Sequence, residues 1–298
     1  MSKKTQKRKN SRSGRKSRSS ARNTQGTARR DQKRMKILLS LLVAASAVII
    51  IVNLFSMILG EREKGDPEKI AVAMVSCAEN STFDHTANYS FIEDIGDGAG
   101  YTGGIIGFTT MTGDMLHIVR DYCEKEDDPP LKKYIPALTA AVGTDKTKGL
   151  GKGFIKEWQK AGKTENMRKV QDSYRDRLFL DPAFDMAEKD GLSTLGKYIY
   201  YDTAVQHGPE GEGSSLANIR KAAMKRAKTP AKGGGEKEYL KEFLRIRENA
   251  LKKLDFKVNL SRIEAQKKLV EDEEFEMLLP LEFTMYGHDF ELTESDLI

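Results

Sequence analysis

An uncharged apolar stretch constrains this chain more than any other feature. Residues 37–59 are 23 positions without a charge, and the only polar side chains in them belong to Ser40, Ser46, Asn53 and Ser56. A helix of that length rises about 35 Å, which is enough to span a hydrocarbon core of about 30 Å. The stretch therefore predicts a transmembrane helix, so that everything after it folds on one side of a membrane.

The charge before this stretch predicts which side that is. Residues 1–34 hold fourteen Lys or Arg residues and one acid, Asp31, so their formal charge is +13. Basic residues before a span keep the N-terminus in the cytoplasm, which places the remainder outside the cell. A cleaved signal peptide is the alternative, but its apolar region would be shorter and end at small residues, whereas Ala45 and Ala47 lie mid-stretch. We favour an uncleaved signal anchor, and in either case the rest of the chain is exported.

The remainder of the chain is acidic. The whole chain carries +6, so residues 35–298 carry −7, and the pI near 9.0 is a property of the tail. An acidic exported part suits a cationic substrate better than nucleic acid. The tail contains no aromatic residue that could stack on bases, and we expect no nucleic-acid partner.

Composition divides the chain into four parts. We expect a disordered basic tail (1–34), a signal anchor (35–60), a polar linker (61–66) and a catalytic domain (67–298). Pro67, with Asp66 as N-cap, predicts a helix that runs to about Glu79. Residues 89–110 interleave glycines with aromatic and β-branched residues, which indicates a small sheet with a tight turn.

Helical patterns dominate from about residue 130 onward. The fold class expected from these patterns is mainly α (α+β), with a small N-terminal β-sheet and two lobes.

Two charged residues stand out within this helical part. Arg247 shares a helix face with Phe243 and Leu251, and Asp202 lies on the apolar face of another helix. Pairing Asp202 with Arg247 would satisfy two buried charges, whereas the alternative is an Arg whose head reaches solvent and an exposed Asp.

Two carboxyls are candidates for acid–base chemistry on a glycosidic bond, which requires such a pair. Glu79 ends an apolar helical row, where partial desolvation favours the protonated form that an acid catalyst needs. Asp97 lies in a Gly-Asp-Gly turn with little bulk around it, where a substrate can approach and solvent keeps the carboxylate ionised. Thr102, just past the turn, has a hydroxyl that could position a water. The alternative is a solvated helix end and ordinary turn chemistry.

The other reactive side chains show no metal or cofactor pattern. The four His residues lack metal-ligand spacing, and Cys77 and Cys123 have no CxxC context. We expect no metal and no cofactor. In an exported domain the two cysteines either form a disulfide or remain free thiols, and the sequence leaves both open.

The sequence also closely resembles the N-terminal signature of glycoside hydrolase family 46 chitosanases. The resemblance begins at Ala78-Glu79-Asn80-Ser81, continues through residues 89–108 and 112–116, and includes later segments at Tyr200-Tyr201-Asp202, His207-Gly208-Pro209, Ile219-Arg220-Lys221 and Lys228-Thr229-Pro230-Ala231. It covers roughly residues 67–290.

The resemblance implies a lysozyme-like, two-lobed fold with a substrate cleft between the lobes. It implies endo-hydrolysis of β-1,4-linked glucosamine chains (chitosan or chito-oligosaccharides) with inversion at the anomeric carbon. We expect a monomer, and the apolar stretch, which is not usual for the simplest secreted members, predicts that it is held to the membrane. By matching position, Glu79 is the general acid, Asp97 the general base, and Thr102 holds the attacking water. Further matches are substrate-binding positions at Asn80, Ser81, Thr112, Asp114 and His207, and a charge network that supports the acid at Asp202, Arg247 and Arg262.

Two departures and two alternatives accompany this hypothesis. Ala99 stands where relatives usually have Arg, and Phe91 where they often have Tyr, so part of the substrate positioning differs.

A muramidase or lytic transglycosylase of the same broad fold would act on an anionic wall polymer, for which a charge of −7 is a poor match. A glycan-binding protein without activity would not need both Glu79 and Asp97.

Overall fold

The computed structural model describes residues 62–254 and 258–297, which belong to one compact unit that begins at Arg62. The predicted basic tail (1–34), anchor (35–60) and membrane span (37–59) lie outside the described residues. Within residues 62–254 and 258–297, no helix combines the length and the apolar character that crossing a membrane requires.

The first described residues are fixed to the C-terminal part of the unit. Arg62 makes a bidentate ion pair with Glu274, at 2.8 and 3.0 Å, and Glu63 forms an antiparallel bridge with Leu279. Helix α2 (Pro67–Asn80) follows, because the side chain of Asp66 caps the Glu68 N–H at 2.9 Å. Residues 62–66 are therefore part of the packed structure.

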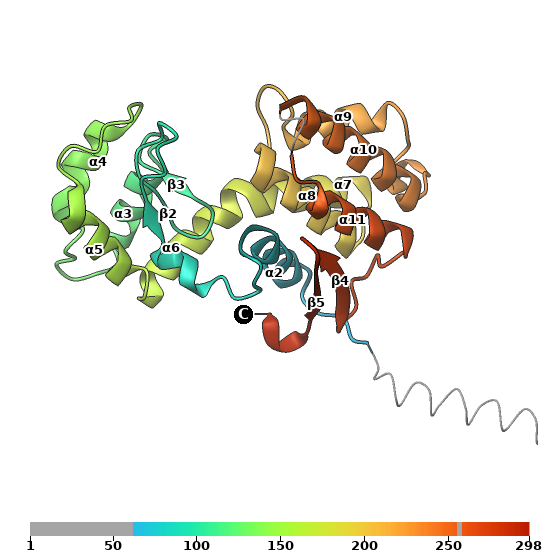
Figure 1. Ribbon diagram of the computed structural model, residues 1–298, viewed down its shortest axis with the longest axis horizontal. Coiled ribbons are helices and arrows are strands. Elements are labelled where there is room, and N and C mark those ends of the chain that lie inside the picture. Colours follow the sequence, from blue (N-terminus) through green and yellow to red (C-terminus); the bar gives the residue numbers. More distant parts are fainter. Residues whose placement is uncertain (1–61, 255–257, 298) are drawn as a thin grey trace, which may run out of the picture. The chain divides into compact units, whose positions relative to one another are not determined.

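The small lobe, residues 86–175, packs helices around a three-stranded antiparallel sheet of order β1-β2-β3 (Figure 1). Its core contains the fully buried side chains of Phe154 and Trp158. Gly103 is required in the central strand, because a Cβ there would lie 2.7 Å from the Phe91 carbonyl oxygen. The elements are β1 (Ile92–Glu93), β2 (Thr102–Gly103), β3 (Phe108–Thr109), α3 (Asp114–Cys123), α4 (Ile135–Ala141), α5 (Gly151–Ala161) and α6 (Glu165–Arg175).

The large lobe surrounds helix α8 (Thr194–His207), which is buried along most of its length and packs against α2 and α7 (Figure 1). Its buried residues include Leu195, Ile199 and Ala204, so α8 forms the centre of this lobe. The other elements of this lobe are α2, α7 (Asp181–Asp190), α9 (Leu216–Met224), α10 (Glu236–Leu254), α11 (Ser261–Glu271), β4 (Leu281–Met285) and β5 (His288–Leu292).

The lobes have separate hydrophobic cores and share a continuous helical connection. Helix α6 runs through a π-helical segment, Asp176–Leu180, into α7. Leu178 packs on the small-lobe core, and Leu180 belongs to the large-lobe core. The mainly helical fold with a small N-terminal sheet is confirmed.

The C-terminal hairpin of β4 and β5 is a feature that the sequence analysis missed. Its register pairs Leu281 with Leu292 and Phe283 with Phe290. Leu281, Phe283 and Met285 alternate with exposed residues, which is the pattern of a strand with one buried face. The turn at Tyr286 and Gly287 has positive φ at both positions.

A buried charge cluster joins three helices of the large lobe. Asp202 of α8 is fully buried, and its Oδ2 lies 2.7 Å from a nitrogen of Arg247 on α10. Its Oδ1 accepts a 2.6 Å hydrogen bond from Arg262 on α11, and Gln266 donates to Oδ2 at 2.7 Å. The pairing of Asp202 with Arg247 that helical spacing predicted is present. Burial alone would raise the pKa of Asp202, but the two guanidinium groups outweigh it and lower that pKa.

We predict that Asp202→Ala lowers the free energy of unfolding by about 3–5 kcal/mol, because it leaves two buried guanidinium groups without their shared carboxylate. Urea denaturation at neutral pH measures this change. Asp202→Asn keeps the volume and one acceptor, and should cost less than Asp202→Ala.

A matched control uses a carboxylate of the small lobe. Glu165 pairs with Lys169 at the surface, and both side chains are largely exposed. Glu165→Ala should leave the urea midpoint unchanged, because solvent screens such a pair. Equal midpoints for Asp202→Ala and Glu165→Ala would show that the buried cluster does not stabilise the fold.

Candidate active site

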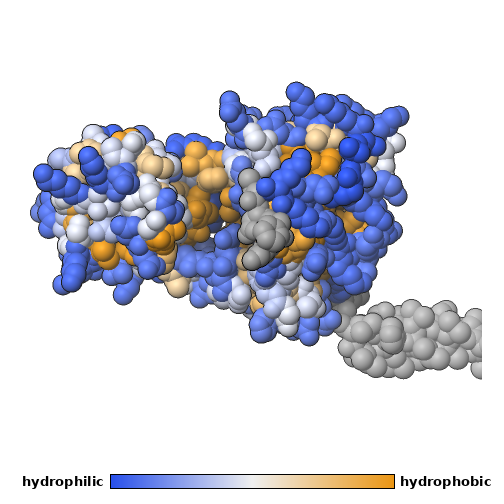
Figure 2. Space-filling model, turned by 45° about the horizontal axis from the view of Figure 1, so that its top comes forward, coloured by the Kyte–Doolittle hydropathy of each residue, from blue (hydrophilic) through white to orange (hydrophobic). Residues whose placement is uncertain are grey.

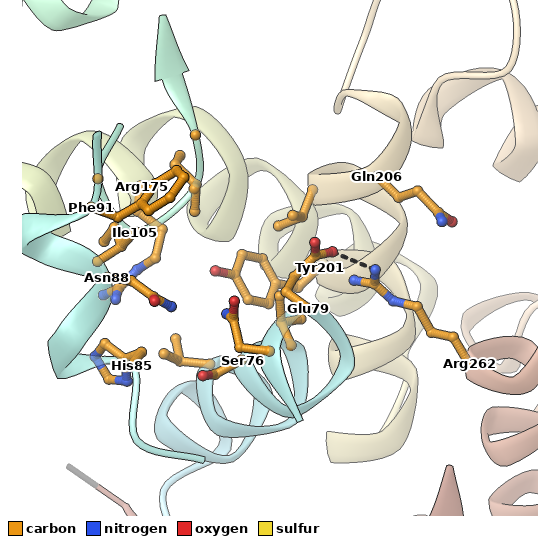
Figure 3. A pocket seen from close by; sticks show the side chains of 17 residues that line it. Ser76, Glu79, His85, Asn88, Phe91, Ile105, Arg175, Tyr201, Gln206 and Arg262 are labelled. Carbon is orange, nitrogen blue, oxygen red and sulfur yellow. Dashed lines mark hydrogen bonds and ion pairs between the residues drawn. The ribbon is translucent and has the colours of Figure 1, made fainter. Parts of the chain in front are cut away.

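A cavity of about 500 Å³ lies between the two lobes and is lined by residues of both (Figure 3). Helix α2 contributes Ser76, Glu79 and Asn80 from the large lobe. The small lobe contributes Phe91 and the turn between β2 and β3, residues 104–107. Apolar side chains gather at the junction of the lobes in Figure 2.

Glu79 reaches this cavity from the last turn of α2. Its side chain is 48% exposed, and its Oε1 is paired with Nη1 of Arg262 (Figure 3). The helix ends directly after it, because Ser81 adopts a left-handed conformation with φ of 56° and donates its N–H to the Cys77 carbonyl. The desolvation expected at this position is thus partial, and the carboxyl remains open to a ligand.

Arg262 links Glu79 to the buried cluster. Its side chain is 7% exposed, its Nε and Nη2 hold Asp202, and only Nη1 faces Glu79. Burial alone would lower the pKa of Arg262, but the charges of Asp202 and Glu79 outweigh it and raise that pKa. Arg247 and Arg262, both predicted for the network, are therefore joined through Asp202, and Arg262 connects the network to Glu79.

Asp97 occupies an open turn of the small lobe. Gly96 and Gly98 on either side have φ of +74° and +84°, and a Cβ at either position would meet nothing within 4 Å. The Oδ1 atom of Asp97 accepts the N–H of Ala99 at 2.9 Å, and the residue is exposed. This carboxylate does not line the cavity that holds Glu79.

Thr102 lies in β2, next to the cavity wall. Its Oγ1 is buried and has no hydrogen-bond partner among the described residues. A Cβ at Gly107, which lines the cavity, would lie 3.4 Å from the Thr102 methyl carbon. Because buried hydroxyls are almost always hydrogen-bonded, an unpartnered one beside a cavity is suited to holding a water or a ligand group.

The remaining predicted site residues divide between the lobes. Asn80 lines the cavity, and Ser81 caps α2. Thr112 and Asp114 lie at the start of α3 and are joined by a 2.6 Å hydrogen bond. His207 ends α8, where burial, assisted by Arg247, lowers its pKa to about 4. None of Ser81, Thr112, Asp114 and His207 lines the cavity beside Glu79.

The two departures from the family pattern have different surroundings. Ala99 is 9% exposed, and its carbonyl oxygen accepts from the Met111 N–H at 3.2 Å. Phe91 is 43% exposed and lines the cavity, while its carbonyl accepts from Trp158 Nε1 at 3.0 Å. The backbone of Phe91 is thus fixed, and its ring is available to a ligand.

Arg175 and Tyr201 also line the cavity, although the sequence analysis did not assign them to the site. Arg175 ends α6 and is paired with Asp172 at 3.0 Å and Asp176 at 2.7 Å. Tyr201 is 1% exposed, and the three tyrosines at 198, 200 and 201 are all in the core. The adjacent Asp202, for which burial was one of two interpretations, was the available signal for Tyr201.

Neither cysteine is bonded, and the described residues show no metal site. Cys77 is a buried free thiol and Cys123 a partly buried one. Burial raises the pKa of Cys77 to about 12, so this thiol is unreactive. In residues 62–254 and 258–297 no group of three or more His, Cys, Asp or Glu side chains could hold a metal ion.

Comparison with known proteins gives one consistent result. A chitosanase from Streptomyces sp. (strain N174) is 43% identical over 228 residues, which is 76% of this chain and 82% of that protein. The structure of chitosanase OU01 with substrate is 41% identical, with a TM-score of 0.71, and covers 78% of this chain and 100% of its own. A Gynuella sunshinyii chitosanase with chitotetraose is 28% identical, with a TM-score of 0.67, and covers 76% and 97%. Residues 73–281 match the model of glycosyl hydrolase family 46, and the chain therefore belongs to that family.

Proposed function

We propose that this member of family 46 hydrolyses β-1,4 bonds within chitosan by an inverting mechanism, with Glu79 as general acid and Asp97 as general base. The observation that carries the proposal is the position of Glu79. Its carboxyl is open to the cavity between the two lobes. The chain that carries it is 43% identical to a chitosanase. The acidic character of residues 35–298, with a formal charge of −7, suits a polycationic substrate.

Glu79 must carry a proton before it can give one to the leaving oxygen. Arg262 contacts it through one nitrogen only, because the other guanidinium atoms are engaged by Asp202. A sugar in the cavity displaces water from the open side of this carboxyl. Arg262 then holds the carboxyl in place and stabilises the carboxylate that remains after proton transfer.

Asp97 is suited to the opposite role. Its exposure and its acceptance of only one backbone hydrogen bond leave the second oxygen free to take a proton from water. The unpartnered Oγ1 of Thr102 could hold that water. An inverting enzyme needs a gap of about 6.5–9.5 Å between its carboxyls to hold the water, and carboxylates on two different lobes suit such a gap.

The anomeric form of the first products tests the reaction as a whole. Proton NMR of the full chain in neutral detergent, acting on fully deacetylated chitosan, should give α-anomers at early times, because water attacks the face opposite the leaving group. Parallel incubations with chitin and peptidoglycan should give little product. Initial β-anomers, or a preference for the N-acetylated polymers, would contradict the proposal.

Amide substitutions test the two carboxyls separately. Glu79→Gln and Asp97→Asn should each lower kcat by about 10²–10⁴-fold, because each removes one proton transfer and keeps the side-chain volume. KM and the melting temperature should stay close to those of the unmodified protein. Activity of Asp97→Asn within a factor of a few of the unmodified enzyme would assign the base to another residue.

We also propose that the chain is a signal-anchored protein of the outer face of the cell membrane. The basic residues at 1–34 and the uncharged run at 37–59 support this location. Protease added to intact cells should digest an epitope placed after residue 298 and spare one placed before residue 1. A mature protein found in the medium and starting within or after residues 37–59 would favour a cleaved, secreted form.

A further inference from the structure

Two threonines hold the carboxylate of Asp114 at the start of α3. Thr112 Oγ1 donates to Asp114 Oδ2 at 2.6 Å. Thr109 Oγ1, at the end of β3, lies 2.8 Å from Thr112 Oγ1 and accepts the Thr112 N–H at 3.1 Å. The three side chains therefore form a hydrogen-bonded series that begins at the sheet and ends at the carboxylate.

The direction of this series follows from the number of hydrogens. A threonine hydroxyl has one hydrogen to donate. Because the hydrogen of Thr112 goes to Asp114, the 2.8 Å contact between the hydroxyls must be donated by Thr109. Without the Thr109 hydroxyl, Thr112 loses both the donor that fixes its oxygen and the acceptor of its N–H. It could then turn towards the Thr109 carbonyl oxygen, which already lies at 3.3 Å.

Thr109 also neighbours the position proposed for the attacking water. It is the direct partner of Thr102 in the pairing of β2 with β3. Directly paired residues of antiparallel strands point to the same face, so the two threonine side chains are adjacent. Thr109 is thus paired with Thr102 in the sheet and is connected through Thr112 to the carboxylate of Asp114.

The family resemblance matches Asp114 to a carboxylate that binds the amine of a glucosamine unit. We propose that Thr109 is a positioning residue that orients this carboxylate, an inference that rests on the proposed function. No group in the described part of the chain donates to the Oδ1 atom of Asp114, so this oxygen is available to a cation. Thr109 acts through Thr112 and does not touch the sugar. Its contribution is the orientation of the carboxylate before the substrate arrives, which lowers the entropy that binding costs.

Isosteric removal of the hydroxyl gives the first test. Thr109→Val in the full chain, in neutral detergent, should raise KM for a glucosamine hexamer by about threefold to tenfold, the range for one hydrogen bond between neutral groups. The value of kcat should stay within about twofold, since Thr109 is outside the acid–base pair. Thr109→Ser retains the hydroxyl and should restore KM. Unchanged KM in Thr109→Val, or no rescue by serine, would overturn the inference.

A double-mutant cycle tests whether Thr109 acts through Asp114. In an Asp114→Asn background, Thr109→Val should cause little further loss, because coupled residues are not additive. A full additional loss would mean that Thr109 only supports the sheet, and would overturn the inference.

Thr284→Val is the matched control. Thr284 lies in β4 on the other lobe, is exposed, and its hydroxyl donates to Asp289 at 2.7 Å. Its removal should leave KM unchanged.

Calorimetric binding separates this inference from the proposed function. In a Glu79→Gln background, which should not turn over, Thr109→Val should weaken binding of the hexamer by the same factor by which it raises KM. An unmodified chain that binds the hexamer without cleaving it would contradict the proposed hydrolysis. Equal affinities with and without Thr109→Val would overturn the role of Thr109.

Discussion

The structure depends on one buried carboxylate. Asp202 holds the guanidinium groups of Arg247 and Arg262, and so fixes α10 and α11 against the central helix α8. Desolvating three charges is costly, and their close pairing, together with hydrogen bonds to Gln266 and Gln206, compensates for it. The same cluster reaches the cavity, because the remaining nitrogen of Arg262 meets Glu79. The same set of side chains thus stabilises the large lobe and orients the proposed acid.

The two lobes contribute different chemistry to the proposed reaction. The large lobe supplies a carboxyl that is fixed by a guanidinium and belongs to a helix end. The small lobe supplies carboxylates and hydroxyls on a short sheet and its turns, where glycines such as Gly96 and Gly98 leave room for a ligand. Separate hydrophobic cores allow each lobe to be rigid by itself. In the proposed function, the cavity between them receives the substrate.

Much of the fold could be predicted because helix caps and the spacing of apolar residues are patterns of neighbouring residues in the sequence. Asp66 and Pro67 gave the start of α2, and helical spacing placed Arg247 and Asp202 in apolar stripes that meet in the structure. The interleaved glycines of residues 89–110 indicated the small sheet, although its strands are only two residues long. The hairpin of β4 and β5 was missed, since its outer face carries charged residues that resemble the neighbouring helical surface.

The sequence by itself determined the family, the helical fold and the identity of the candidate carboxyls, because residue type and spacing along the chain carry those signals. It could not determine that Arg262 engages Glu79 through a single nitrogen, since the two residues are 183 positions apart. Nor could it decide between free and bonded cysteines, or order the hydroxyls of Thr109 and Thr112 into a directed series. Those features depend on which atoms the packing of distant segments brings within hydrogen-bond distance, and only the tertiary structure specifies that.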